Sequence, residues 1–316
     1  MKTITQTKRL YLREFSLDDA IHFYNMNLDN DVIKYTGDNA FSSEAEAREF
    51  IANYNQYKLY NMGRWAVCDK TTHEFLGWCG LKHHPKSIID NHFVEVGYRF
   101  YKTHWSKGYA TESAKAAIHY GFNILNLKTI YAHAHIDNLA SHKVLEKCNL
   151  QFIHEDNYDG MPAKLYKIEA PNITIKQISS IETYLVRHPV LRAGRPIEDC
   201  EFSGDNLEST IHLGLYYNNT LAGVATFLKQ DNSVFNEGSN YQLRGMAVLK
   251  RHQGKKLGKA LLKHGEALLK SKGISLVWFN AREVAISFYK RNGYTIIGDS
   301  FEIPIIGIHF VMYKKL

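Results

Sequence analysis

The sequence is poor in proline and cysteine and has no long apolar run, and each scarcity excludes a class of protein. Only 6 of 316 residues are proline and no tract is of low complexity, which argues against a disordered chain. No window reaches the roughly 18 uninterrupted apolar residues that a membrane helix needs. The cysteines show no C-x-x-C spacing, so neither a disulfide framework nor a zinc site is indicated, and we expect buried free thiols at Cys68, Cys79, Cys148 and Cys200.

Signals for export and for nucleic-acid binding are missing as well. The opening stretch, MKTITQTKRL, lacks the apolar segment of a signal peptide, so we expect a cytoplasmic protein with no membrane partner. The net charge of +7 is spread along the chain without an RNA-binding aromatic signature, which argues against a nucleic-acid partner. Small polyanions remain attractive ligands for a chain with so many cations.

What is present is the composition of a packed protein with two domains. Apolar residues make up 45% of the chain and charged residues 22%, which suits full hydrophobic cores. A length of 316 residues exceeds most single cores and favours two domains of about 150 residues. Residues 169–173, EAPNI, contain a proline and no periodicity, so we place the boundary there, between domains at 1–169 and 173–316.

The two halves follow the same order of predicted elements. The first half is predicted to contain, in order, a strand (8–15), helical stretches (16–26 and 43–60), a hairpin (64–84), a strand (92–101), a helix (111–125), a strand (129–136) and a helix ending at Asn149. The second half is predicted to contain a strand (173–178), a hairpin across an Asn-Asn turn (211–228), a strand (241–249), a helix after a glycine turn, a strand (275–281) and a helix (283–294).

Matching positions confirm the repeat by arithmetic. Three pairs are 148 residues apart: Phe100 and Val248, Gly108 and Lys256, Ala110 and Gly258. Three later pairs are 144 apart: Ser141 and Ala285, Leu145 and Tyr289, Asn149 and Gly293. A four-residue change in one loop accounts for the difference, so the sequence predicts a duplicated domain rather than a solenoid.

Each half has a basic glycine turn between a strand and a helix, WSKGYATE (105–112) and HQGKKLGK (252–259). Such a turn presents backbone N–H groups without helical partners, and the helix dipole adds positive charge, so it binds phosphate. Lysines at 107, 255, 256 and 259 add charge at the rim. The alternative is a tight turn that carries only solvated lysines.

The turn lacks the P-loop pattern G-x-x-x-x-G-K-[ST] and the dinucleotide pattern G-x-G-x-x-G. The pattern Gln/Arg-x-x-Gly-x-Gly/Ala after a buried strand instead resembles the pyrophosphate cradle of the GNAT family of N-acetyltransferases, and here it runs from Gln253 to Gly258. The first half resembles the ribosomal-protein alanine acetyltransferase (RimJ/RimL) branch through TKRLYLR, VEVGYRF, WSKGYATE and NLASHKVLEK. The second half resembles a poorly characterised branch through RHPVLRAG, FNAREVAISFYKRNGY and FEIPIIGIHFVMYK.

This resemblance implies an α/β fold of two tandem GNAT domains, each a mixed, largely antiparallel twisted sheet flanked by helices. It implies acetyl-CoA as cosubstrate, with no metal. The cofactor contacts it implies are Phe100, Trp105, Ser106, Lys107, Gly108, Tyr109, Ala110, Thr111 and Asn138 in the first half, and Met246, Val248, Gln253, Gly254, Lys255, Lys256, Leu257, Gly258 and Lys259 in the second. Three positions depart from the pattern: Trp105 and Ser106 replace Gln/Arg and a glycine, and Lys256 replaces the middle glycine.

Acetyl transfer to an amine requires a base and an acid, and several residues are candidates for these two roles. An alkyl ammonium has a pKa near 10.4, so a base or water chain must remove a proton, and the leaving thiolate needs an acid. The resemblance assigns that acid role to Tyr289, whose alternative is a core aromatic beside Phe288. In the first half Leu145 stands there, and the resemblance points to Ser141 instead. Glu95 is the candidate base, directly or through water, or else a carboxylate on a partly exposed strand face.

Other polar residues carry weaker signals. His133 and His135 share one face of a predicted strand, but no carboxylate or cysteine completes a metal set, so ordinary strand histidines are expected. The base of the second half stays open among Glu302, His309 and His212. The polar insertion at 188–205 is a candidate substrate-selecting loop.

The sequence therefore predicts a tandem acetyltransferase that moves acetyl from acetyl-CoA to a primary amine by direct attack, with no covalent enzyme intermediate. The acceptor is a small molecule or a peptide N-terminus, and the chain is a monomer or a homodimer. In one alternative, one half is catalytic and the other is a CoA-binding or structural module, as in the mycothiol synthase type of tandem. In another, both halves are acyl-CoA sensors.

Overall fold

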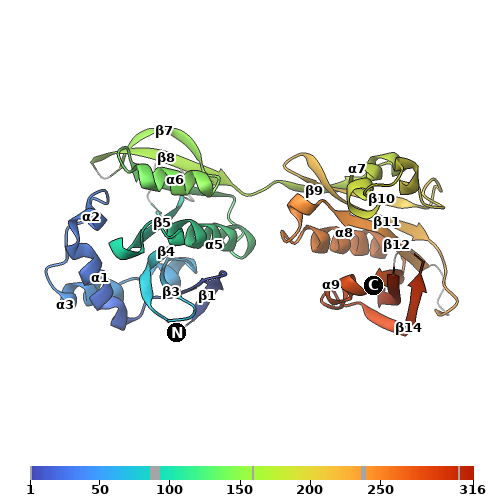
Figure 1. The fold of residues 1–316 in the computed structure, drawn as a ribbon, viewed down its shortest axis with the longest axis horizontal. Coiled ribbons are helices and arrows are strands. Elements are labelled where there is room, and N and C mark those ends of the chain that lie inside the picture. The colour runs from blue at the N-terminus through green and yellow to red at the C-terminus, as the bar shows by residue number, and fades with distance from the viewer. Residues whose placement is uncertain (1, 86–92, 159, 236–239, 305–306) are drawn as a thin grey trace. The chain divides into compact units, whose positions relative to one another are not determined.

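A computed structural model describes residues 2–85, 93–158, 160–235, 240–304 and 307–316 (Figure 1). The chain divides into two compact units, Met1–Ala170 and Pro171–Leu316. Within the described ranges, no helix combines the length and the apolarity needed to cross a membrane. All four cysteines are buried and unpaired, as expected.

The first unit is built on a sheet in the order β1-β2-β3-β4-β5-β6-β8-β7. Neighbouring strands are antiparallel except β5 and β6, which run parallel. The strands are β1 Thr3–Gln6, β2 Leu10–Arg13, β3 Arg64–Asp69, β4 Phe75–His83, β5 Val94–Phe100, β6 Thr129–His135, β7 Gln151–Tyr158 and β8 Met161–Glu169. The strand expected at 92–101 begins within the described residues, at Val94, whereas His92 lies outside them.

Helices cover both faces of this sheet because successive residues of a strand point to opposite sides. On β3, Val67 packs with α5, whereas Cys68 packs with α1 and α3. The helices and 3-10 turns are η1 Leu17–Asp19, α1 Ala20–Leu28, α2 Asn30–Ile33, α3 Glu44–Ala52, α4 Gln56–Tyr60, η2 Lys102–His104, α5 Tyr109–Asn123 and α6 Leu139–Lys147. The helical stretch expected at 43–60 is two helices, because Asn53 ends α3 and Asn55 begins α4.

The second unit has a sheet in the order β14-β15-β13-β12-β11-β10-β9. Read from β9, this order repeats that of β2 to β7 in the first unit, so the predicted duplication and the predicted fold class are confirmed. Its elements are β9 Ile173–Gln177, α7 Ser180–Leu191, η3 Ile197–Cys200, β10 Ile211–Tyr217, β11 Thr220–Lys229, β12 Asn240–Val248, η4 Lys250–His252, α8 Leu257–Ser271, β13 Leu276–Arg282, η5 Glu283–Ala285, α9 Ile286–Lys290, β14 Thr295–Ile303 and β15 Gly307–Lys315.

Two local predictions have different outcomes. The Asn-Asn turn is confirmed, since Asn218 and Asn219 have φ of 49° and 62° between β10 and β11. The helix expected over 283–294 was too long: a 3-10 turn precedes α9, which ends at Lys290. The left-handed residue Gly293 follows the end of α9, as the left-handed residue Asn149 follows the end of α6 in the first unit.

The two parallel strands at the centre of each sheet pair over a very short length. Within the described residues, β5 and β6 pair only at Glu95 and Tyr131, and β12 and β13 pair over Asn240–Gln242 and Leu276–Trp278. The strands then lead to the glycine turn on one side and to the helix after β6 or β13 on the other. Each sheet is therefore joined at its centre by one short parallel pairing.

The central strands of the two units differ by a bulge. In β12, Gly245 and Met246 stand opposite the single residue Ala225 of β11, and Gly245 has φ of 54°. The pairing of β4 with β5 runs from Gly77 to His83 without a shift. The bulge changes the alignment of the halves, as described below for Glu95.

Candidate active sites

The glycine turns of the two units share one geometry. Trp105 donates its indole N–H to the carbonyl of Phe100 at 2.9 Å, and Gln253 donates its side-chain amide to the carbonyl of Val248 at 3.0 Å. Both pairs are five residues apart and occupy matching positions. The departure of Trp105 from the sequence pattern therefore preserves the hydrogen bond that fixes the start of the turn.

The backbone alternates into the left-handed region at two matching positions. Ser106 and Gly108 have φ of 61° and 82°, and Gly254 and Lys256 have φ of 77° and 61°. Ser106 and Lys256 thus adopt the conformation of the glycines that they replace. A Cβ at Gly254 would meet no atom within 4 Å, so the space above the turn is open.

The amides of each turn are available to an anion. In the first unit, Trp105 N–H donates to Lys102, and the next recorded backbone donor is Glu112, which donates to Gly108. In the second unit the equivalent donors are Gln253 and Ala260. The intervening amides lie at the positive end of α5 or α8, so the arrangement fits a pyrophosphate.

Predicted cofactor residues lie in and around these turns. Phe100 ends β5, residues 105–108 form the first turn, and residues 109–111 begin α5. Met246 and Val248 lie on β12, residues 253–256 form the second turn, and residues 257–259 begin α8. Asn138 is the N-cap of α6, where its side chain accepts from the Ser141 amide at 3.1 Å.

The first turn has a clamp that sequence reasoning missed. Arg9 bonds Glu112 at 2.7 Å, donates to the carbonyl of Lys107 at 3.0 Å and lies 4.6 Å from the centroid of the Tyr109 ring. Arg9 is about 100 residues away from the turn in sequence. The one sequence signal that includes it is the stretch TKRLYLR, which contributed to the resemblance to the RimJ/RimL branch but did not indicate a contact with the turn. In the second unit Lys255 lies over the Tyr217 ring at 4.5 Å.

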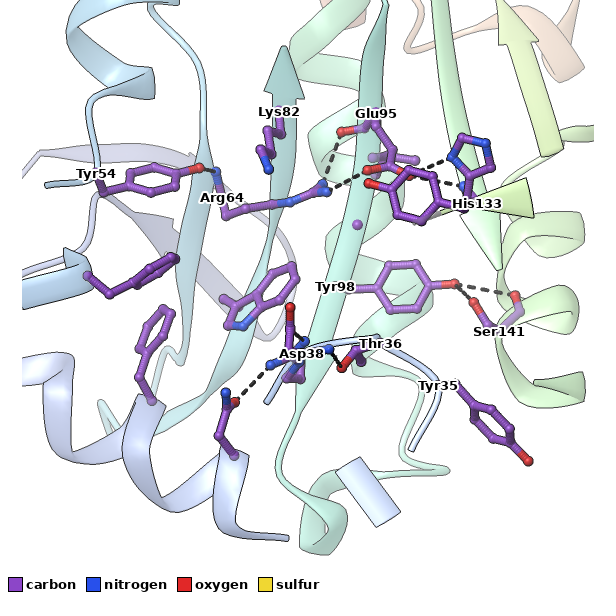
Figure 2. Close-up of a pocket in the computed structure, with 18 of the residues that line it drawn as sticks. Tyr35, Thr36, Asp38, Tyr54, Arg64, Lys82, Glu95, Tyr98, His133 and Ser141 are labelled. Carbon is purple, nitrogen blue, oxygen red and sulfur yellow. Dashed lines mark hydrogen bonds and ion pairs between the residues drawn. The ribbon is translucent and has the colours of Figure 1, made fainter. Parts of the chain in front are cut away.

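A cavity of about 920 Å³ opens beside β5 in the first unit (Figure 2). Tyr98 of β5 and Ser141 of α6 meet on its wall, where their hydroxyl oxygens are 2.9 Å apart. Burial raises the pKa of Tyr98, so this phenol stays protonated. Ser141, the predicted proton donor, therefore has a second hydroxyl beside it that the sequence did not indicate.

Glu95 also lines the cavity and is surrounded by cationic or polar donors. It contacts Arg64 at 3.0 Å, His84 at 3.4 Å and the backbone and ring of His133 at 3.1 and 3.2 Å. Burial alone would raise the pKa of Glu95, but hydrogen bonds from His133 and His84 and the charge of Arg64 hold it well below its usual range. Glu95 is 6% exposed, so the alternative of a partly exposed strand carboxylate is wrong.

His133 is the partner of Glu95 and not an isolated strand histidine. Its Nε2 lies 3.2 Å from Asp156 on β7, and its ring stacks on Tyr158 at 4.2 Å. The ring of His135 lies instead 5.0 Å from that of Tyr35, tilted by 31°. Among the residues that the structure describes, no group of three or more His, Cys, Asp and Glu side chains is arranged to hold a metal ion.

Tyr289 of the second unit packs in an aromatic cluster and also presents its hydroxyl to β12. Its ring is 4.2 Å from Phe279 and 5.0 Å from Phe288, and its hydroxyl is 3.8 Å from Met246 Sδ. Burial raises the pKa of Tyr289 to about 12. The two interpretations of this residue are therefore compatible: a core aromatic whose proton is kept at neutral pH.

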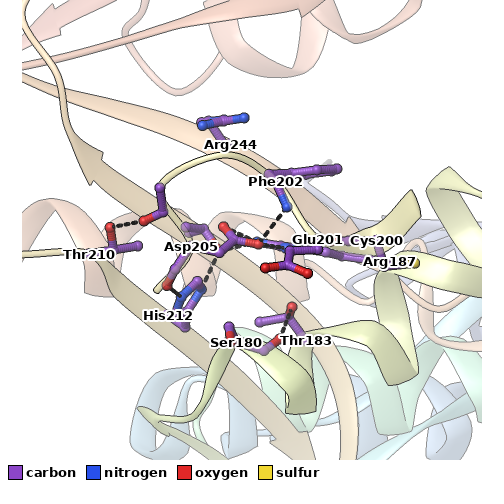
Figure 3. Close-up of polar contacts among 12 residues, drawn as sticks. Ser180, Thr183, Arg187, Cys200, Glu201, Phe202, Asp205, Thr210, His212 and Arg244 are labelled. Carbon is purple, nitrogen blue, oxygen red and sulfur yellow. Dashed lines mark hydrogen bonds and ion pairs between the residues drawn. The ribbon is translucent and has the colours of Figure 1, made fainter. Parts of the chain in front are cut away.

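The polar insertion is held by a buried arginine (Figure 3). Arg187 of α7, which is 0% exposed, pairs with Asp205 and donates to Thr226 at 2.6 Å. His212 joins the same network through Thr226 and the Asp205 carbonyl, each at 2.8 Å. Gly245 allows β12 to approach, since a Cβ there would lie 2.7 Å from Arg187 Nε.

The three candidate bases of the second unit lie on different strands. His212 belongs to the Arg187 network, His309 is buried on β15, and Glu302 is exposed on β14. The recorded contacts of the described residues link none of them to Tyr289. Register places Gln242 at the position of Glu95, since each pairs with the third residue of the next strand.

Comparison with known proteins covers both units. Residues 9–151 match a family model described as acetyltransferase (GNAT) domain, and residues 178–294 match one described as acetyltransferase (GNAT) family. An uncharacterised N-acetyltransferase, YitI of Bacillus subtilis (strain 168), is 41% identical over 144 residues, which are 46% of this chain and 97% of YitI. The uncharacterised protein YkkB of the same strain is 33% identical over 174 residues, covering 54% of this chain and 98% of YkkB.

The solved structures that are similar to this chain include spermidine N-acetyltransferase from Vibrio cholerae in complex with CoA and spermine. It aligns with a TM-score of 0.44 and 23% identity over 52% of this chain and 97% of its own.

Proposed function

Because the chain belongs to the GNAT family and is an N-acetyltransferase, we propose that each unit binds acetyl-CoA at its glycine turn and transfers the acetyl group to a primary amine. The observation that carries this proposal is the matched pair of turns. Both have a side-chain bond to the carbonyl of residue 100 or 248, two left-handed residues and a following run of amides at a helix N-terminus. Such amides favour the pyrophosphate of CoA.

The amine attacks the thioester directly in this proposal. The N–C bond forms as the C–S bond breaks, the amine loses one proton, and the CoA thiolate gains one. In the second unit Tyr289 supplies the proton to the thiolate, which its raised pKa of about 12 supports. In the first unit Ser141 does so, with the Tyr98 hydroxyl at 2.9 Å holding it in place.

The cavity of the first unit supports an amine that carries an apolar portion. An aromatic wall lines it, formed by Phe15, Phe23, Phe41, Phe50, Tyr54 and Trp78. Glu46 and Glu49 of α3 lie at the same cavity and add negative charge beside Phe50, which is 45% exposed. Aromatic faces and carboxylates attract an ammonium group with an apolar body. A small molecule or a peptide N-terminus with an apolar first residue meets this description.

A second candidate function assigns catalysis to the first unit and CoA binding alone to the second. The observation that favours it is Gln242, which takes the place of Glu95 and cannot accept a proton. In addition, the cavity of about 450 Å³ in the second unit is lined by residues 198 and 201–207 of the insertion and its flank. The protonated hydroxyl of Tyr289 beside β12 argues against this second candidate, because a unit that only binds CoA needs no proton donor there.

Thiol release with a panel of amines tests both forms of the proposal. The panel contains arylalkylamines, alkylamines, polyamines and peptides with free N-termini, each supplied with acetyl-CoA. We expect turnover to be fastest with amines that carry an apolar portion. No thiol release with any amine would contradict the proposed function, and release that persists at the wild-type rate when Gly258 is replaced by valine would assign all catalysis to the first unit.

A further inference from the structure

Three arginines of the second unit, which we call the arginine cluster, lie together beside the insertion: Arg192, Arg244 and Arg282. The guanidinium of Arg192, at the end of α7, lies 5.0 Å from the centroid of the Phe202 ring. That of Arg244 on β12 lies 5.4 Å from the same centroid, as Figure 3 shows from one side. Arg282 ends β13, and its charge, after burial and the charge of Arg195, lowers the pKa of Arg192. Three different elements therefore bring a positive charge to one place.

Within the ranges that the structure describes, no ion pair includes a member of the arginine cluster. Nearby carboxylates are paired with other cations, Asp205 with Arg187 and Asp199 with Arg195 at 2.6 Å. The recorded side-chain hydrogen bonds of the cluster go to backbone carbonyls, at 2.6 to 3.2 Å. A guanidinium has five N–H donors, so most donors of the cluster make no recorded bond to the described residues.

Register places two members of the cluster on the face of the sheet that carries the cavity in the first unit. When the units are aligned at their parallel pairings, Arg244 of β12 takes the position of Gly97 on β5. Arg282, the seventh residue of β13, takes that of His135, the seventh residue of β6. Gly97 and His135 both line the cavity of the first unit. The cluster therefore lies where the second unit would receive its acceptor.

The two units present opposite charges at this place. In the first unit the cavity is lined by Glu46 and Glu49 of α3 and by Glu95 of β5. In the second unit the insertion follows α7, and α3 has no counterpart among the described residues. Gln242 takes the position of Glu95 there. Because complementary charge selects binding partners, the two units should select different acceptors.

We propose that the arginine cluster binds the carboxylate or phosphate group of an acceptor amine in the second unit. This inference rests on the proposed function of that unit and names the class of its acceptor, a primary amine that also carries an anionic group. Guanidinium groups recognise both anions through paired N–H donors. The Phe202 ring orients two of these groups, since planar guanidinium groups stack on aromatic faces.

Repulsion between the cations favours an anion among them. Burial lowers the pKa of Arg192, and the charges of Arg195 and Arg282 lower it further. Burial also lowers the pKa of Arg244, where the charge of Asp205 opposes this effect and that of Arg187 adds to it. Both side chains stay charged at neutral pH, because the pKa of a guanidinium is ordinarily above 12. A bound anion relieves the repulsion, which adds to its affinity.

Pairs of amines that differ in the anionic group test the proposal. Phenylalanine is compared with phenethylamine, and O-phosphoethanolamine with ethanolamine, by calorimetry on the full chain saturated with CoA, so that no acetyl transfer occurs. We expect at least one of the two anionic amines to bind more tightly than its partner without the anion. Tighter binding of phenylalanine assigns a carboxylate to the site, and tighter binding of O-phosphoethanolamine assigns a phosphate.

Arg282→Gln is the decisive variant, because Arg282 is exposed and its side chain makes no recorded hydrogen bond to the described residues. It should weaken binding of the anionic amine by about 10-fold or more, the loss expected for a charge-assisted hydrogen bond. Arg291→Gln is the matched control, since Arg291 is exposed at the end of α9 and its loss removes the same charge outside the cluster. Equal losses in both variants would overturn the site, because net charge alone would then explain the binding.

Failure of this inference and failure of the proposed function give different results. Anionic amines that do not bind, or that bind Arg282→Gln as tightly as wild type, would overturn the arginine site, whichever amine the second unit acetylates. Thiol release from acetyl-CoA measures the function separately, since the part of the rate that Gly258→Val removes is the share of the second unit. Binding that depends on Arg282, without such a share for any amine, would contradict the proposed function of the second unit and support the anion site.

Discussion

At the scale of single residues, both units place a hydroxyl beside the central strand, but they take it from different elements. In the first unit the central strand supplies it, as Tyr98, and α6 adds Ser141. In the second unit Met246 occupies the position of Tyr98, and Tyr289 of α9 extends its hydroxyl toward that methionine. A protonated hydroxyl beside the central strand is thus common to both units, although neither residue matches its counterpart.

Replacing Tyr289 by phenylalanine should separate chemistry from packing. The ring keeps its contacts with Phe279 and Phe288, so the free energy of unfolding should change little. Loss of the proton donor should lower turnover of the second unit by about 10²–10⁴-fold without weakening acetyl-CoA binding. Single-turnover kinetics measure the first quantity and calorimetry the second.

Tyr294 offers a matched control in the same cluster. It is 3% exposed and its ring lies 5.9 Å from that of Tyr289, but no contact between described residues directs its hydroxyl to β12. Tyr294→Phe should therefore leave turnover within about twofold of wild type. Equal losses in both variants would return Tyr289 to the role of a core aromatic.

Sequence reasoning identified residues whose neighbours are close in the chain and missed those whose partners are distant. Asn149 and the Asn-Asn turn were predictable because a cap or a turn is a local conformation. The partners of Glu95 were not, since Arg64 and His133 reach it from strands 31 and 38 residues away. In the sequence, Trp105 only departs from the Gln/Arg of the motif. That its indole replaces the Gln/Arg hydrogen bond to the Phe100 carbonyl could not be predicted, because this bond depends on the path of the backbone through the turn.

At the scale of elements, the second glycine turn should tolerate a methyl group but not a branched side chain. A Cβ at Gly258 would lie 3.5 Å from Met246 and Phe288, which is ordinary contact, so the fold itself accepts alanine. Ala110 already occupies the matching place in the first unit. Gly258→Val should abolish CoA binding in the second unit, because its branches reach past this contact distance and displace Met246, Phe288 or the first turn of α8, whose amides would bind the phosphates.

Calorimetry with CoA compares the two substitutions. Gly258→Ala should retain two sites, whereas Gly258→Val should retain one. Two sites of wild-type affinity in the valine variant would show that this turn is not the cradle.

The insertion at 188–205 should depend on the buried pair of Arg187 and Asp205. Asp205→Ala leaves the guanidinium buried beside Phe202 without its carboxylate, and breaking such a pair costs about 3–5 kcal/mol. The double variant Arg187→Met, Asp205→Ala should cost less, since no unpaired charge remains. Urea denaturation measures both. A single variant within about 1 kcal/mol of wild type would mean that the pair contributes little.

The succession of the central strands along the chain was predictable, but the details that shape the second site were not. Alternating and buried patterns predicted the strands from β2 to β6 and from β9 to β13, and the duplication gave their sequence along the chain twice, whereas β1, β7, β8, β14 and β15 were not predicted. In the sequence, the bulge of β12 is marked by nothing except Gly245. The glycine is needed because Arg187, which belongs to α7, packs against the backbone there. The same bulge shifts Gln242 to the place of Glu95, which an alignment by residue count alone misses.

At the scale of the whole molecule, two units with separate cores should respond to one cofactor separately. A ligand that binds only the folded state raises the free energy of unfolding by about 2.7 kcal/mol at a hundredfold excess over its dissociation constant. Saturating acetyl-CoA should therefore raise the melting temperature of both units in calorimetric scans. With Gly258→Val, only the first unit should still be stabilised. An unchanged melting curve of the wild-type chain would contradict binding at either turn.

The short parallel pairing described for each sheet has a mechanical consequence. Among the residues that the structure describes, each sheet consists of two half-sheets joined along one seam, by a single pair of residues in the first unit and by three pairs in the second. A ligand arm that lay along this seam would close it much as an added strand does. The cosubstrate would then be a stiffening part of the scaffold as well as a reactant, and the first unit, with the weaker seam, would gain the more rigidity when loaded.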